Sequence, residues 1–184
     1  MKKYLLFLPI LLSIATVSSQ TKTNEKIIFS DNFKTYQNGS DGSPTWHTVK
    51  GNWQIIKGKY VQQSNEYDCA SMLDIFLNES FEMEVSFEHL EGDPGVGFIF
   101  SSRQRDNIDY AQMVRFNGSA ILLFGYFQNG EFNGTFSTKT EEIKPSVKHQ
   151  LTLRVNRDDD QCTILLDSKE ILVGASLKFP SGYV

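Results

Sequence analysis

Apolar and polar residues alternate strictly over residues 81–88, which read Phe-Glu-Met-Glu-Val-Ser-Phe-Glu. Successive side chains of a strand point to opposite faces, so the pattern predicts a strand with one buried face. A helix would scatter the acidic residues around its axis. The alternation returns over 151–155, Leu-Thr-Leu-Arg-Val. No window shows a helical period over ten or more residues, and at most a turn of helix is expected over 141–147.

Turn signals divide the rest of the chain into short apolar runs. Asn-Gly pairs stand at 117–118, 129–130 and 133–134, and these two residue types tolerate the positive φ angles that tight hairpins need. Many short antiparallel strands predict an all-β fold, a two-sheet jelly-roll sandwich. Further strands are expected over residues 27–29, 46–49, 52–56, 59–63, 71–76, 96–101, 110–116, 120–127, 163–166 and 170–173.

The first nineteen residues have the pattern of an export signal. Lys2 and Lys3 precede an apolar stretch over 4–17, and small residues at 17–19 offer a cleavage site before Gln20. The stretch is shorter than the roughly 20 apolar residues of a membrane-spanning helix, and no second one follows, so stable membrane insertion is not expected. No Cys stands at the cleavage position to carry a lipid anchor.

The predicted organisation is therefore a signal peptide over 1–19, a short lead over 20–26 and one sandwich domain over 27–184. The exported protein would be periplasmic, attached to the cell surface or secreted. Apolar residues make up 40% of the chain, which is enough for a core, and 18 basic against 22 acidic residues give a net charge of -4. A nucleic-acid-binding protein normally has a basic excess on one face, so nucleic acid is not an expected partner.

The two cysteines leave two interpretations open. Export would place Cys69 and Cys162 in an oxidising compartment, where a disulfide can persist. A bridge requires adjacent Cβ atoms, and sequence positions about ninety residues apart do not determine this. A disulfide and two separate buried thiols therefore both stand as expectations.

Four phrases carry a resemblance to a known family: IIFSDNF, WHTVKGNWQIIKGKYVQ, FEMEVSFEHLEGDPGVGFIFSSR and NIDYAQMVRF. In this order they resemble the laminin-G-like, concanavalin-A-type jelly rolls of exported bacterial proteins. These include modules described as 3-keto-disaccharide hydrolases or family-sixteen-like glycosidase domains. The resemblance extends over residues 27–184 and implies two curved antiparallel sheets, with carbohydrate as a frequent ligand.

The sequence departs from this family in two places. Family members commonly continue past a phrase like SGYVGL into a final strand that pairs near the first, whereas this sequence ends at Ser-Gly-Tyr-Val, residues 181–184. We therefore expect a truncated C-terminus or a sandwich without its last strand. The hydrolase members carry acidic positions around a Tyr-Glu-x-Gln strand, and residues 110–113 read Tyr-Ala-Gln-Met, which weighs against catalysis.

The alternating strand also supplies the candidate catalytic carboxylates. Glycoside hydrolysis uses two carboxyl groups about 5 Å apart, or roughly 6.5–9.5 Å apart, according to the stereochemistry. Glu82, Glu84 and Glu88 share one strand face, where residues two apart lie about 7 Å from each other. Their spacing differs from the Glu-x-Asp-x-x-Glu pattern of the laminarinase-type enzymes, and the solvated face of an amphipathic strand is the preferred interpretation. No zinc motif or nucleophile elbow is present.

A structural calcium ion is a further expectation from the resemblance, because jelly rolls of this type often hold one through loop carboxylates and carbonyls. Asp31, within the phrase FSDNF, is the candidate ligand. The acidic run over 158–160 lacks the spaced pattern of a calcium loop and is interpreted as a hairpin turn.

Sugar binding requires aromatic rings for the apolar face of a pyranose and planar polar groups for its hydroxyls, on a concave surface. Further rings come from Trp53, Tyr60, Tyr67 and Tyr126, most of them expected in the core. A regular strand would place residues 110 and 115 on opposite faces, so both can line one groove only at a bulge or strand end. The predicted ligand-binding residues are Trp46, Arg103, Asp106, Tyr110, Gln112 and Arg115.

The sequence thus predicts an exported, non-catalytic carbohydrate-binding module whose partner is a polysaccharide or oligosaccharide. One alternative is a glycoside hydrolase of the 3-keto-disaccharide hydrolase type. The other is a structural or adhesion sandwich with a protein partner. Two close carboxylates in a cleft would favour the enzyme. An exposed aromatic platform without such carboxylates would favour the carbohydrate-binding module, and a flat polar face would favour the adhesion module.

Overall fold

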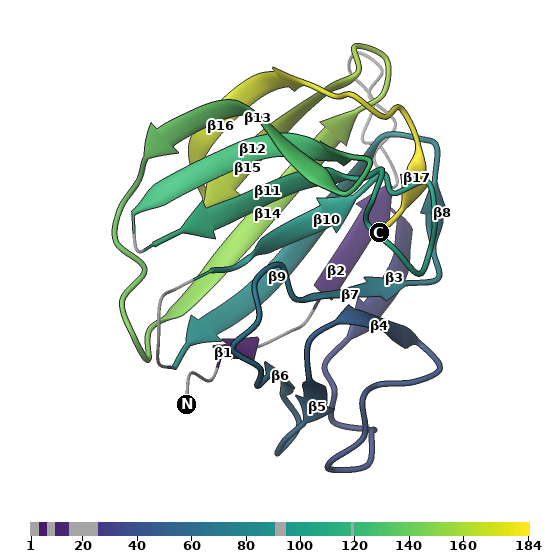
Figure 1. The fold of residues 1–184 in the computed structure, drawn as a ribbon, viewed down its shortest axis with the longest axis vertical. Helices are drawn as coiled ribbons and strands as arrows, with labels where there is room; N and C mark the ends of the chain where they lie inside the picture. The colour runs from purple at the N-terminus through teal and green to yellow at the C-terminus, as the bar shows by residue number, and fades with distance from the viewer. Residues whose placement is uncertain (1–3, 7–9, 15–25, 91–94, 119) are drawn as a thin grey trace.

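The computed structural model is an all-β sandwich (Figure 1). It describes residues 4–6, 10–14, 26–90, 95–118 and 120–184. These residues form strands and turns without an α-helix, so none of them belongs to a helix that could cross a membrane. The all-β sandwich predicted from the alternating pattern is confirmed.

One layer of the sandwich is a nine-stranded sheet in which all pairs are antiparallel. Two of the nine strands, β2 (Ile10–Ile14) and β3 (Lys26–Asp31), lie off the main path, where β2 pairs with both β9 and β3. The main path runs β16 (Lys169–Ser176), β15 (Gln161–Leu166), β14 (Lys148–Asn156), β9 (Phe81–His89), β1 (Tyr4–Leu6), β6 (Tyr60–Gln62) and β5 (Trp53–Ile55).

The other layer is built from three smaller sheets. The largest has the order β10 (Gly97–Phe100), β11 (Gln112–Asn117), β12 (Ile121–Gln128) and β13 (Glu131–Lys139). Two strand pairs complete the layer: β4 (Trp46–Lys50) with β7 (Ala70–Leu73), and β8 (Phe76–Leu77) with β17 (Gly182–Tyr183).

The last residues of the chain connect these small sheets. The backbone N–H of Ser102, just after β10, donates to the carbonyl of Tyr183 at 3.0 Å. The N–H of Leu73 in β7 donates to the carbonyl of Val184 at 2.6 Å. The C-terminal segment therefore holds β7 and the end of β10 in one layer.

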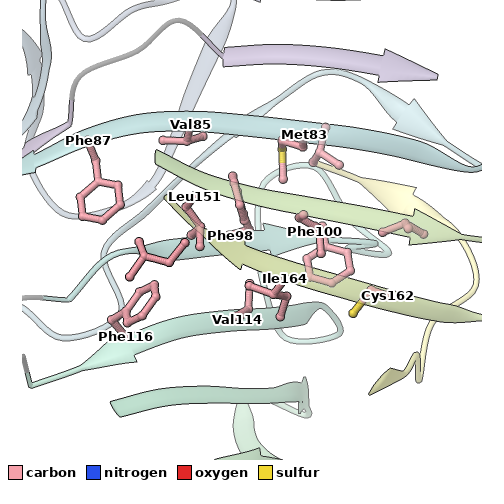
Figure 2. Packing of buried hydrophobic residues seen from close by; sticks show 14 of the residues in the cluster. Met83, Val85, Phe87, Phe98, Phe100, Val114, Phe116, Leu151, Cys162 and Ile164 are labelled. Carbon is pink, nitrogen blue, oxygen red and sulfur yellow. The ribbon is translucent and has the colours of Figure 1, made fainter. Parts of the chain in front are cut away.

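The core lies between the two layers, as the strand alternation predicted. Phe81, Met83, Val85 and Phe87, the apolar residues of β9, are all buried. Figure 2 shows three of them in one cluster with residues from the facing strands β10 and β11 and from the neighbouring β14 and β15. The labelled partners are Phe98, Phe100, Val114, Phe116, Leu151, Cys162 and Ile164.

Two of the three Asn-Gly turn predictions are confirmed. Gly118 has a φ of 63° between β11 and β12, and Asn129 and Gly130, with φ of 54° and 75°, form the turn between β12 and β13. The third is wrong, because Asn133-Gly134 lies inside β13, a strand that the sequence pattern did not predict. The register there shifts between Phe124, which pairs with Phe136, and Gly125, which pairs with Gly134, so β13 contains a bulge. A Cβ atom on Gly125 would meet the carbonyl oxygen of Asn133 at 2.2 Å, so the glycine permits a close approach of two backbones.

The loop over 141–147 contains no helical turn. The strands β1 and β2 fall within residues 1–19, the predicted export signal. Nothing in the fold tests whether that segment is removed, so the signal peptide and the domain boundaries stay predictions.

Two valines in neighbouring parts of the large sheet provide a test of the layered core. Val155 of β14 is 3% exposed, whereas Val173 of β16 is 64% exposed. We expect Val155→Ala to lower the free energy of unfolding by about 2 kcal/mol, because it removes buried methyl groups and leaves a cavity. The matched change Val173→Ala should cost less than about 0.5 kcal/mol. Urea unfolding followed by tryptophan fluorescence measures both, and equal losses would contradict the proposed position of the core.

Candidate functional site

A cavity of about 570 Å³ opens at the place where β7 and β10 lie apart in the second layer. Residues 66–69 and β7 line one side, and β10 and β11 line the other. The inner face of β9 contributes Met83, Val85 and Phe87. A volume of this size falls within the range of about 300–1,000 Å³ typical of small-molecule sites.

The local sequence keeps this gap open. Gly95 and Gly97 stand at the cavity wall just before and at the start of β10. A Cβ atom on Gly97 would meet the carbonyl oxygen of Val114 at 1.9 Å, so only glycine permits the close approach of β10 to β11. The wall is therefore formed by backbone alone at these two positions.

Aromatic rings surround one side of the cavity. Tyr67 is 85% exposed and makes no ring contact with its neighbours in the described structure. Trp53 is half-buried and stacks on Tyr60, with ring centroids 4.9 Å apart, and its Nε1 donates to the carbonyl of Lys50 at 2.9 Å. Burial raises the pKa of Tyr60 to about 12. Tyr60 thus stays a neutral part of the core, while Tyr67 presents a free ring.

Polar side chains face the same space from two elements. Arg115 of β11 forms an ion pair with Asp68 and lies over the ring of Phe132, with 5.5 Å from Cζ to the ring centroid. Gln62 of β6 is 4% exposed, and its Nε2 donates to the carbonyl and the hydroxyl of Ser64 at 3.1 and 2.5 Å. The carbonyl contact fixes which end of this amide is the donor.

Two of these polar atoms have no hydrogen-bond partner among the described residues. They are Oε1 of Gln62, an acceptor, and Nε of Arg115, a donor. Buried polar atoms are nearly always paired, so these two are exceptions within the described residues. Both atoms are buried, so other atoms of the Gln62 and Arg115 side chains face the cavity.

The structure brings only two of the six predicted ligand-binding residues to this cavity. Arg115 contributes its guanidinium group, whereas Trp46 is buried in the core and its Nε1 donates to Asp31 at 2.9 Å. Gln112 is fully buried and both ends of its amide are used: Nε2 donates to the carbonyl of Gly125 at 2.7 Å and Oε1 accepts from the N–H of Lys178 at 2.9 Å. Its role in the structure is to hold the C-terminal segment on the sheet.

The other three predicted residues lie elsewhere. The guanidinium of Arg103 stands over the rings of Tyr110 and Phe179, with Cζ 5.3 and 5.1 Å from the centroids. Tyr110 precedes β11 and donates its hydroxyl hydrogen bond to Asn129. Asp106 is exposed in the loop after β10. None of the three lines the cavity.

The candidate catalytic glutamates are not assembled at the cavity. Glu82 forms an ion pair with Arg154, with 2.5 Å between Oε2 and Nε. Glu88 borders the cavity and Glu84 does not. Their four-residue separation on β9 corresponds to about 13 Å along a strand, which exceeds the separations that glycoside hydrolysis uses.

Asp31 serves the aromatic core in this structure. Its Oδ1 accepts from the N–H of Phe33 at 2.8 Å, and its Oδ2 accepts from the Tyr36 hydroxyl at 2.6 Å and from Trp46 Nε1. Burial, followed by this hydrogen bond, raises the pKa of Tyr36 above its ordinary value. The described residues contain no group of three or more His, Cys, Asp or Glu side chains placed to hold a metal ion. Asp31 as a calcium ligand therefore has no support here, and calcium itself stays a prediction.

The disulfide expectation is wrong for this structure, because Cys69 and Cys162 are both free thiols. Cys69 precedes β7 and lines the cavity, where its sulfur accepts from Gln62 Nε2 at 2.9 Å. Cys162 lies in β15 within the core, opposite Val155. The two thiols thus lie in different surroundings, one in the cavity lining and one in the core.

Sequence reasoning missed three polar residues of the cavity: Gln62, Glu66 and Asp68. Residues 64–69 form a loop between two predicted strands, and such loops on a rigid scaffold often carry binding residues. That loop combines one aromatic and two acidic residues, and this composition is the sequence signal that could have indicated a binding loop. No feature of the sequence indicates that Gln62 and Arg115 line the same cavity.

Comparisons with known proteins support the fold. No protein-family model matches the chain, and no curated protein matches it. Among solved structures, the carbohydrate-binding module CBM66 from Bacillus subtilis is similar, with a TM-score of 0.64 and 20% sequence identity. The match covers 76% of this chain and 84% of that one. The chain therefore has the β-sandwich fold that this module also has.

Removal of the Asp31 carboxylate should destabilise the fold. Asp31→Ala would leave buried donors of Trp46 and the Phe33 backbone without a partner, so we expect a loss of about 2–4 kcal/mol in the free energy of unfolding. As a control, Asp41→Ala removes an acceptor in an exposed turn, where the N–H of Ser43 lies 3.0 Å from Oδ1, and should cost less than about 1 kcal/mol. Urea unfolding curves compare the two variants, and a similar small loss in both would contradict the structural role of Asp31.

The two thiols should react very differently. Burial raises the pKa of Cys162 to about 12, so at pH 8 this thiol carries almost no thiolate, the form that alkylating reagents attack. We expect iodoacetamide to modify the native protein at Cys69 alone, and to modify both cysteines in guanidinium chloride without a reductant. Peptide mass spectrometry identifies the sites. A denatured protein that resists alkylation until it is reduced would reveal a disulfide instead.

Proposed function

We propose that the chain is a non-catalytic carbohydrate-binding module of the concanavalin-A-like type and that the cavity between β7 and β10 is its sugar site. The observation that carries the proposal is the combination, in one cavity lining, of an exposed aromatic ring at Tyr67 with the polar side chains of Gln62, Asp68 and Arg115. A sugar presents an apolar ring face and hydroxyl groups that both donate and accept. The similar structure is itself named a carbohydrate-binding module, which supports the same class of ligand.

Each part of the site suits one part of a sugar. The ring of Tyr67 offers a face for the C–H groups of a pyranose or furanose. The Arg115–Asp68 ion pair offers donors and acceptors side by side, as neighbouring hydroxyls require. The carboxylates of Glu66, Asp68 and Glu88 outnumber the guanidinium of Arg115 in the cavity lining, so a neutral sugar suits the site better than an anionic one.

The hydrolase alternative has less support from the geometry. Asp68 and Glu82 are each engaged by an arginine, and the candidate glutamates of β9 are divided between the cavity and the outer face. Within the proposal, export from the cell places the module where polysaccharides and oligosaccharides are found. A glycan array probed with calcium and with a chelator identifies the sugar and shows whether a metal ion contributes.

Loss of the exposed ring should weaken sugar binding without affecting the fold. We expect Tyr67→Ala to reduce the affinity for the sugar found on the array by roughly tenfold, which corresponds to about 1.4 kcal/mol. Isothermal titration calorimetry measures the affinity. Phe136→Ala is the matched control, since it removes an aromatic ring that is also exposed but lies on β13, away from the cavity.

Alkylation of Cys69 distinguishes sugar binding at this cavity from sugar binding elsewhere. Bound sugar should slow the alkylation of Cys69, whose sulfur lies in the cavity wall. Unchanged affinity in Tyr67→Ala, together with unchanged alkylation of Cys69, would place the sugar site on another surface.

A further inference from the structure

The chain contains four Asn-Gly pairs, at residues 38–39, 117–118, 129–130 and 133–134. The asparagine of such a pair is open to attack on its side-chain carbonyl carbon by the backbone nitrogen of the next residue, because glycine has no side chain to hinder that attack. All four asparagines and all four glycines are exposed. Exposure therefore does not distinguish the four pairs, and the hydrogen bonds of each pair decide which one is free to react.

The attack requires two groups to be free. The asparagine amide must rotate toward the backbone, and the N–H of the glycine must be available to lose its proton. A hydrogen bond to either group has to break first, which lowers the rate of the reaction.

The pair at 38–39 is held at both groups. Oδ1 of Asn38 accepts from the N–H of Lys57 at 2.8 Å. The N–H of Gly39 donates to the carbonyl of Ile55 at 2.7 Å.

The pair at 129–130 is held in the same way. Oδ1 of Asn129 accepts from the hydroxyl of Tyr110, and the N–H of Gly130 donates to the carbonyl of Asp109 at 3.3 Å.

The pair at 133–134 is held by its strand. Nδ2 of Asn133 donates to the carbonyl of Glu131 at 3.0 Å. Both residues of the pair lie inside β13 and are in register with β12, which fixes their backbone.

The pair at 117–118 has neither kind of restraint. Asn117 is the last residue of β11, and Gly118 lies in the turn that follows, with a φ of 63°. Within the described part of the chain, no hydrogen bond holds the Asn117 side chain or the N–H of Gly118. A Cβ atom on Gly118 would meet no atom within 4 Å, so the turn has space for a five-membered ring.

We propose that Asn117 is a site of spontaneous deamidation in the folded protein. The nitrogen of Gly118 bonds to Cγ of Asn117, and the bond from Cγ to Nδ2 breaks. The proton of the Gly118 N–H passes through water to the leaving nitrogen, which departs as ammonia. Water then opens the cyclic imide at one of its two carbonyls and returns a proton to the Gly118 nitrogen. The product is aspartate or isoaspartate at position 117.

This modification changes the candidate cavity, because Asn117 and Gly118 belong to its lining. The lining already contains the carboxylates of Glu66, Asp68 and Glu88, and deamidation adds a further negative charge to it. Isoaspartate also lengthens the backbone by a methylene group at the end of β11. The inference is independent of the proposed sugar site, since the reaction needs only this chain and water.

Incubation of the folded full chain in heavy-oxygen water at mildly alkaline pH tests the proposal. Each new deamidation incorporates heavy oxygen, so peptide mass spectrometry locates it and separates it from older events. We expect Asn117 to deamidate at least about fivefold faster than each of the other three asparagines, which must first break a hydrogen bond. In guanidinium chloride the four rates should agree within about twofold, because the hydrogen bonds are lost. Tryptophan fluorescence verifies that the native sample stays folded.

Two variants test the cause of the difference. Tyr110→Phe removes the hydroxyl that holds Asn129 and should raise the deamidation rate at Asn129 about threefold, with the rate at Asn117 unchanged. Asn117→Gln keeps an amide at the turn but would require a larger ring, so it should abolish the fast reaction at this position. The rates at the other three asparagines should stay as they are in this variant.

Three outcomes would overturn the proposal. Equal rates at the four asparagines of the folded chain would show that the turn at 117–118 is not especially reactive. The same excess at Asn117 in guanidinium chloride would assign the reactivity to the neighbouring sequence instead of the fold. An unchanged rate at Asn129 in Tyr110→Phe would show that these hydrogen bonds do not protect the pairs.

Discussion

The structure depends on one constraint: the apolar face of β9 must be covered and both of its edges must be paired. The covering is complete, since Phe81, Met83, Val85 and Phe87 are enclosed by the facing strands β10 and β11 and by neighbouring apolar residues of β14 and β15. The pairing is complete only on the β14 side without help from the N-terminal segment. The central strand is therefore the centre of the core, and its second edge is paired only by β1 and β2.

The same strand connects the core to the candidate site. Its inner face lines the cavity because β7 and β10, which would otherwise cover it, are joined only where Tyr183 and Val184 bridge them. A sandwich gains stability by closing its two layers, and a gap in one layer exposes core surface. Here polar groups of Gln62, Asp68 and Arg115 surround the gap, and this composition makes it suitable for a ligand with hydroxyl groups.

Much of the fold followed from local pattern, and little of the site did. The period-two segments gave the strands of the core, and Asn129-Gly130 gave a hairpin, because both signals act between residues close in sequence. Asn133-Gly134 was wrongly predicted to form a turn, because the residue types that allow a turn also allow a bulge. Gln112 and Trp46 were predicted to bind a ligand, yet both are buried. They form hydrogen bonds with Lys178 and Asp31, which are distant from them in the sequence.

The sequence by itself determined the class of fold and the buried face of the central strand, because side-chain alternation and turn chemistry are local properties. Only the tertiary structure decided which polar residues share a space. Gln62, Asp68 and Arg115 come from three separate segments, and their meeting depends on how two layers are stacked. It also decided that the thiols of Cys69 and Cys162 stay apart, since distance in space between strands of different layers is set by packing rather than by sequence.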